Sequence, residues 1–189
     1  MVAKDLKAFW ESLLSEPKQP SKGGDLTDDE AILKTFFETY ELLKEARKVR
    51  KISLKEFFKG LVEIIKALSY FVQYENCFDE REKKMQISVL QGYLETLFEF
   101  MHNEIALKSL YESSYRVMKE VRREGLIDIN FYWKKLIMFV ISLTEEIHDL
   151  DLPDEKIRLL IPFLISFLKF YQWTLVEKRL QILESDGTT

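Results

Sequence analysis

Apolar residues recur along most of the chain with a period close to 3.6 residues, the spacing that places them on one face of an α-helix. The first such segment covers residues 3–15, and its apolar face consists of Leu6, Phe9, Trp10, Leu13 and Leu14. This pattern predicts an amphipathic helix. The ten residues that follow, 16–25, contain two prolines and two glycines and are a predicted linker with a reach of about 30 Å.

Two capping-box sequences predict where the next helices begin. Thr27 and Ser53 each precede a glutamate by three residues, which is the pattern that satisfies free N–H groups at a helix start. We expect one helix from Thr27 to about Arg50, with an apolar face of Ile32, Phe36, Tyr40 and Leu43, and another helix that Ser53 opens. The apolar line of the second is Phe57, Leu61, Ile64, Leu68 and Val72, with further apolar residues beside it, so this helix needs cover on more than one side.

Between Asp79 and Glu124 only Gly92 interrupts a helical pattern, but one continuous helix would be about 68 Å long. The apolar faces of its two halves would also point in different directions. The first half has an apolar face of Leu90, Leu94, Leu97 and Met101, and the face of the second half lies about half a turn away, at Leu107, Leu110, Ser114, Met118 and Val121. We therefore predict a break near residues 102–104 and a C-terminal cap at Gly125.

Two more helices complete the chain. Asp128 or Asn130 caps the first of them, whose core line is Trp133, Leu136, Val140, Leu143 and Ile147. The last helix begins with Pro153 in its first turn, runs to about Glu184 and is expected to kink at Pro162. The predicted fold is an all-α, single-domain bundle of about six helices over residues 27–189, preceded by an N-terminal helical arm and linker over 1–26. The last helix and the one after Ser53 should lie near the centre.

Composition supports this fold and restricts the setting. Six glycines and four prolines in 189 residues are too few for a sandwich or barrel of many short strands. A single cysteine excludes an internal disulfide and indicates a reducing, cytoplasmic compartment. We expect no membrane span, since the most apolar stretch, 159–168, has only ten residues without a charge. The chain has only nine Asn and Gln residues but 28 basic and 32 acidic ones. A low amide content with a high content of charged residues is typical of thermophile proteins.

The only two histidines each follow a glutamate by three residues, as Glu99–His102 and Glu145–His148. Paired Glu-x-x-His motifs on facing helices are typical of ferritin-like metal proteins, with Glu63 and Glu112 as candidates for the two remaining carboxylates. However, the helical period directs Glu99 away from the core, and both histidines fall in the last turn of their helices. The favoured interpretation is boundary residues with no bound metal or cofactor.

Two basic stripes are candidate anion-binding sites. The first consists of Lys44, Arg47, Lys48, Arg50, Lys51, Lys55 and Lys59, and the second of Arg116, Lys119, Arg122 and Arg123 on the side opposite Leu110 and Met118. Such stripes neutralise phosphates in nucleic-acid-binding proteins. The net charge of −4 and the position of both stripes at helix C-termini favour structural, solvated charge instead.

The sequence contains no glycine-rich phosphate loop, no Gly-x-Ser-x-Gly motif and no Cys-x-x-Cys motif. We therefore expect a non-enzymatic interaction protein or accessory subunit that binds a protein partner or its own copies, with the arm as its partner-binding segment. A nucleic-acid-binding accessory protein that uses the basic stripes is the alternative, and a ferritin-like metal protein is the second alternative.

Overall fold

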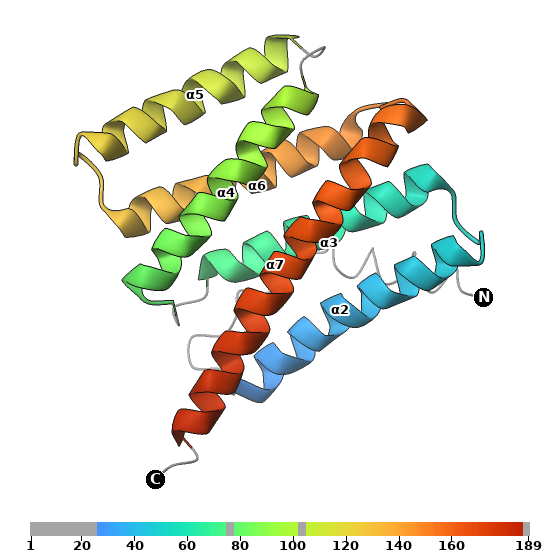
Figure 1. Cartoon of the computed structure of the whole chain (residues 1–189), viewed down its shortest axis with the longest axis horizontal. Helices are drawn as coiled ribbons and strands as arrows, with labels where there is room; N and C mark the ends of the chain where they lie inside the picture. Colours follow the sequence, from blue (N-terminus) through green and yellow to red (C-terminus); the bar gives the residue numbers. More distant parts are fainter. Residues whose placement is uncertain (1–25, 75–77, 102–104, 187–189) are drawn as a thin grey trace.

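The computed structural model describes residues 26–74, 78–101 and 105–186, and every regular element within these ranges is an α-helix (Figure 1). The helices are α2 (Leu26–Lys48), α3 (Leu54–Tyr74), α4 (Glu80–Phe100), α5 (Ile105–Arg123), α6 (Ile129–Asp149) and α7 (Asp154–Asp186). The predicted all-α bundle is thus confirmed. The predicted arm over 3–15 and its linker lie outside the described residues.

The helices form two layers. Figure 1 shows α2, α3, α6 and α5 side by side in that order, with α4 and α7 crossing in front of them. α4 packs on α6, and α7 packs on α3. As a result α2 and α5 occupy the two opposite edges of the back layer, and each has one main neighbour there, α3 and α6 respectively.

The centre of the core is the antiparallel contact between α3 and α6, the most extensive helix pair in the described fold. Its side chains are fully buried and include Leu61, Ile64, Leu68, Leu136, Val140 and Leu143. An ion pair and a histidine–carboxylate contact also bridge these helices: Lys66 Nζ lies 2.9 Å from Glu145 Oε1, and His148 Nε2 lies 3.3 Å from Glu63 Oε1. The central position predicted for α3 is confirmed, while α6 takes the second central place that we expected α7 to hold.

Aromatic side chains join the two helices of the front layer to each other, and one of them also bonds to the back layer. Tyr93 of α4 stacks on Phe167 of α7, with 3.9 Å between ring centroids, and this contact fills the space where the two helices lie over α3 and α6. The hydroxyl groups of Tyr171 and Ser69 lie 2.8 Å apart and link α7 to α3 within the core. These hydrogen bonds satisfy polar groups that would otherwise be buried without a partner.

Capping residues fix the helix starts largely as predicted. The Ser53 box is present: Glu56 N–H donates to Ser53 Oγ over 3.1 Å, and Ser53 N–H donates to Glu56 Oε2 over 2.6 Å. Of the two candidate caps of α6, Asp128 is the one used, since its carboxylate accepts from Phe131 N–H. Asp79 forms a further box with Glu82 that the sequence analysis did not identify.

The predicted break between α4 and α5 is confirmed, since α4 ends at Phe100 and α5 begins at Ile105. The predicted stop at Gly125 is confirmed as well. Gly125 has a φ of 75°, and its N–H and that of Leu126 donate to the carbonyls of Arg122 and Val121. This is a Schellman cap, which requires the left-handed conformation that glycine adopts without a steric penalty.

Four positional expectations were wrong. α2 begins at Leu26, so Thr27 lies inside the helix rather than ahead of it. Pro153 precedes α7, and its carbonyl accepts from Lys156 and Ile157, so it occupies the cap position instead of the first turn. Ile32 and Leu110 were placed on buried faces and are exposed, because α2 and α5 are edge helices that contact the bundle over a narrower arc than their apolar residues cover.

Within the described ranges, no helix has both the length and the apolar character that crossing a membrane requires.

The two glycines Gly125 and Gly92 give a matched test of the cap. Gly125→Ala should lower the free energy of unfolding by about 1 kcal/mol, because alanine is strained at positive φ. Gly92→Ala should raise it by about 0.5–1 kcal/mol, because Gly92 is helical and an added Cβ there meets nothing within 4 Å. Urea unfolding of both variants measures these changes. Equal effects at the two positions would contradict the cap assignment.

The Ser53 box should give a measurable pH dependence. Hydrogen bonds from the Ser53 backbone N–H, and then from its side chain, hold the pKa of Glu56 below its ordinary value of 4.5. The stability that this charge contributes is therefore fully present above about pH 5.5 and is lost as pH falls through the lowered pKa.

Glu56→Gln keeps the geometry of the box but removes the charge. In urea unfolding from neutral to acid pH, its stability deficit relative to the wild type should vanish at the acid end. Ser53→Ala is the control whose deficit persists at every pH. A deficit of Glu56→Gln that is constant with pH would be inconsistent with a lowered pKa.

Candidate functional site

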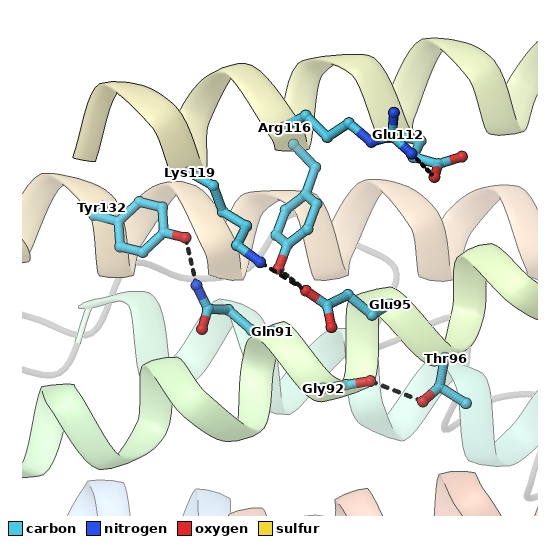
Figure 2. Close-up of polar contacts among 9 residues, drawn as sticks. Gln91, Gly92, Glu95, Thr96, Glu112, Arg116, Lys119 and Tyr132 are labelled. Atoms are coloured by element: carbon cyan, nitrogen blue, oxygen red, sulfur yellow. Dashed lines mark hydrogen bonds and ion pairs between the residues drawn. The ribbon is translucent and has the colours of Figure 1, made fainter. Parts of the chain in front are cut away.

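Polar contacts, together with the side chains of Tyr111, Tyr115 and Met118, hold the edge helix α5 against the bundle. Figure 2 shows Lys119 of α5 directed at Glu95 of α4, with Nζ 3.0 Å from Oε1. The hydroxyl of Tyr115, which is buried, donates to the same Glu95 oxygen over 2.7 Å. One carboxylate on α4 therefore holds two side chains that lie one turn apart on α5.

This carboxylate is electrostatically matched to its two partners. The hydrogen bond from Tyr115 has the largest effect and lowers the pKa of Glu95; burial opposes it, and Lys119 lowers the pKa further. Burial raises the pKa of Tyr115, as do its hydrogen bond to Glu95 and the charge of Glu95. Tyr115 is consequently a neutral donor and Glu95 an anionic acceptor, which makes a charge-assisted hydrogen bond.

Further polar contacts hold the inner side of α5 and its neighbours. Arg122 Nη1 donates to the Ile127 carbonyl over 2.8 Å and joins the end of α5 to the loop before α6. Tyr111 OH lies 3.5 Å from Glu146 Oε1 of α6. Beside them, Gln91 of α4 donates to Tyr132 of α6 over 2.6 Å (Figure 2). Because the contacts of Tyr111, Lys119 and Arg122 come from one side of α5, they fix how the helix is rotated about its own axis.

As a consequence, half of the apolar face of α5 points to solvent. We call this line the outer seam, and it consists of Leu110, Ser114, Val117 and Val121. Leu110 is 66% exposed and Val117 is 61% exposed, Ser114 is exposed, and Val121 is half-buried. Leu126, which is 69% exposed, extends the seam, since its N–H donates to the Val121 carbonyl. Three of the most exposed large apolar side chains of the described residues therefore gather along one helix edge.

The spacing of the outer seam is that of a coiled coil. Its residues stand at i, i+4, i+7 and i+11, which alternates steps of four and three residues and places all four within about 60° around the helix. We did not predict this surface, because we expected this helix to have a single buried face. The apolar arc of α5 is in fact too wide for one neighbour, since Tyr111, Tyr115 and Met118 face the bundle while Leu110 and Val117 do not.

A hollow of about 560 Å³ lies between α4 and α5, on the polar side of α5. Its lining residues are Glu95, Phe98, Glu99, Lys108, Glu112, Tyr115, Arg116, Lys119 and Glu120. Acidic and basic groups alternate in this lining and several pair with one another, as Arg116 does with Glu112 over 2.8 Å (Figure 2). The hollow therefore presents no single sign of charge to a ligand.

Most residues of the two basic stripes have an acidic or carbonyl partner. In the first stripe Lys44, Lys48 and Lys55 pair with Glu41, Glu45 and Asp151, and Arg47 donates to the Ile52 carbonyl. In the second, Arg116, Lys119 and Arg123 pair with Glu112, Glu95 and Glu120. Lys51 is exposed in the loop between α2 and α3.

The second stripe was also misplaced. We expected it to lie opposite the packed side of α5, but Lys119 and Arg122 face the bundle, because the contacts of Glu95 and of the Ile127 carbonyl draw them inward.

The structure separates the residues of the two Glu-x-x-His motifs. Glu99 is exposed and lines the hollow, Glu145 pairs with Lys66, and His148 is half-buried against Glu63. His102 lies outside the described residues. In the part of the chain that is described, no three His, Cys, Asp or Glu side chains are grouped as a metal ion would require. Of the two proposed additional carboxylates, Glu63 does contact a histidine, whereas Glu112 pairs with Arg116.

The apolar residues predicted to bind a partner through the arm, Leu6, Phe9, Trp10, Leu13 and Leu14, lie outside the described residues. The other edge helix, α2, exposes Ile32, Leu42 and Val49. That line is interrupted, since Thr39 and Ala46, which stand between them at helical spacing, are buried. The outer seam of α5 is therefore the more continuous of the two apolar edges.

The anchoring role of Glu95 can be measured with a double-mutant cycle. Tyr115→Phe and Glu95→Gln should each destabilise the protein, and their effects should couple by about 1–2 kcal/mol, because the hydrogen bond between them involves a charged group. Urea unfolding of the two single variants and the double variant gives the coupling. Tyr171→Phe, which removes a hydroxyl bonded to Ser69, is the control that should add to Glu95→Gln without coupling. Simple additivity of Tyr115→Phe and Glu95→Gln would mean that Glu95 does not anchor α5.

The chain matches no protein-family model, no curated protein and no solved structure.

Proposed function

We propose that this chain is a non-enzymatic protein–protein interaction subunit that binds its partner through the outer seam of α5. One observation supports the proposal above all: α5 turns Leu110 and Val117 to solvent while polar contacts hold its other side against the bundle. An amphipathic helix normally buries its apolar side, and contiguous exposed apolar residues on a folded domain mark an interaction surface.

The energetics favour a helical partner. Burial of apolar surface stabilises a complex by about 25 cal/mol per Å², and Leu110, Val117 and Leu126 are the groups that would supply it here. A seam with alternating steps of three and four residues fits a second helix through knobs-into-holes packing. Ser114, which lies between Leu110 and Val117, is small enough to let the axes of two helices approach closely.

The polar groups of the described fold support a structural rather than a catalytic role. Glu95, Tyr115 and Lys119 satisfy one another, and so do Ser69 and Tyr171 in the core. A cytoplasmic setting belongs to the same proposal and is supported by the single cysteine of the sequence.

The test compares two baits in extracts of the source cells. The wild type should retain a partner that Leu110→Lys/Val117→Lys retains at least about tenfold less, because buried lysines oppose docking of an apolar face. Titration of the purified partner against both forms then measures the loss. The matched control is Leu159→Lys/Trp173→Lys, which changes two exposed apolar residues of α7 and should leave retention unchanged.

Deletion of residues 1–24 separates the seam from the arm. The shortened chain should retain the same partner as the full chain. Retention lost with the arm, or retained equally by the wild type and Leu110→Lys/Val117→Lys, would contradict the assignment of the interface to α5.

A further inference from the structure

We infer that the partner of the outer seam is a second copy of this chain, paired antiparallel through α5. The inference rests on the proposed function and names the occupant of the same surface. It follows from the order of large and small residues along the seam, from the distribution of charge along α5 and from the position of the chain's remaining residues.

In an antiparallel pair, the large and small side chains of the two seams fit one another in layers of facing residues. If the two-fold axis passes between Tyr115 and Arg116, Leu110 of one copy faces Val121 of the other, and Ser114 faces Val117. The two remaining layers repeat these pairs by symmetry. Each serine therefore meets a valine, and each leucine meets a valine, so that all four layers contain a branched apolar side chain. A parallel pair would instead place Ser114 against Ser114 and leave one layer without an apolar side chain.

The distribution of charge along α5 also favours the antiparallel pair. Residues 116–123 carry four basic residues and one acidic residue, whereas residues 108–115 carry one of each. The antiparallel pair sets the basic half of one α5 beside the neutral half of the other, while a parallel pair would align the two basic halves. Beside the seam, Ser113 of one copy lies opposite Glu120 of the other, and Glu120 is already paired with Arg123 of its own chain. No like charges meet in the antiparallel pair.

The arm of the same chain is the other apolar segment that could cover the seam. The described chain begins at Leu26 in α2, and α2 lies at the edge of the back layer opposite α5 (Figure 1). Three helix-to-helix steps of about 8–10 Å separate these edges. The ten-residue linker covers that distance only when it is almost fully extended. Binding of the arm to its own seam would therefore cost the linker its conformational freedom, a cost that a second copy does not carry.

The seam supplies only four layers of facing residues. We expect these to bury less area than a standard interface, which buries about 800 Å² on each partner. We therefore expect a concentration-dependent dimer, with dissociation constants in the micromolar range or weaker. Sedimentation velocity over roughly 5–500 µM should show the wild type moving from monomer to dimer. Leu110→Lys/Val117→Lys should raise the dissociation constant about tenfold or more. Leu159→Lys/Trp173→Lys should leave it unchanged.

Cysteine cross-linking tests the direction of pairing. In a Cys77→Ser background, which removes the only native cysteine, the chain carrying Leu110→Cys is mixed with the chain carrying Val121→Cys and a short thiol cross-linker. The antiparallel pair predicts a cross-linked heterodimer that neither chain forms as strongly alone. Ser166→Cys is the control: this exposed serine of α7 donates to its i−4 carbonyl over 3.0 Å, as Ser114 does, and it should give no cross-link.

Each other outcome overturns the inference. A wild type that stays monomeric over the whole range excludes the second copy, and if it still binds a partner that Leu110→Lys/Val117→Lys does not, the proposed function survives alone. A dimer that Leu110→Lys/Val117→Lys leaves intact, or that deletion of residues 1–24 abolishes, uses another surface. Cross-links of Leu110→Cys with itself in place of the mixed product would show a parallel pair. If the wild type neither dimerises nor binds any partner, both proposals are wrong.

Discussion

The antiparallel packing of α3 on α6 is the contact on which the remaining helices depend. Both helices carry apolar residues over more than half of their circumference, and residues such as Ile64 and Leu136 have no exposed surface. Two helices alone cannot cover so wide an apolar surface, which is why α4 and α7 form a second layer and α2 and α5 close the edges. Each edge helix has one main neighbour in its layer, so a wide apolar arc on it is only partly covered.

On α5, polar contacts decide which residues are left out. Glu95 accepts hydrogen bonds from Tyr115 and Lys119 and thereby sets the rotation of the helix against α4. Placing the apolar face of α5 fully inward would turn Lys119 away from Glu95 and leave that carboxylate without its ion pair. The observed rotation satisfies the polar groups and exposes Leu110 and Val117, and the proposed interaction surface is the result of this balance.

The charges of this protein illustrate why a stripe read from sequence is weak support for a binding site. Lys119 and its partner Glu95 are 24 residues apart and lie on different helices. Lys55 pairs with Asp151, which is 96 residues away. Sequence spacing reveals pairs within one helix, such as Glu112 with Arg116, but it carries no information about which helices become neighbours. The same limit applies to His148, whose contact with Glu63 depends on the packing of α3 on α6.

The sequence by itself determined the elements: the helical periods of α3 and α6, the break between α4 and α5, the Ser53 box and the glycine stop at Gly125. All of these depend on interactions between residues a few positions apart, so a local pattern is sufficient to predict them. The tertiary structure alone decided which face of α5 is buried, where the basic side chains point and which helix shares the centre with α3. These depend on partners supplied by other helices, and the choice between an apolar and a polar contact face is made by the competition between them.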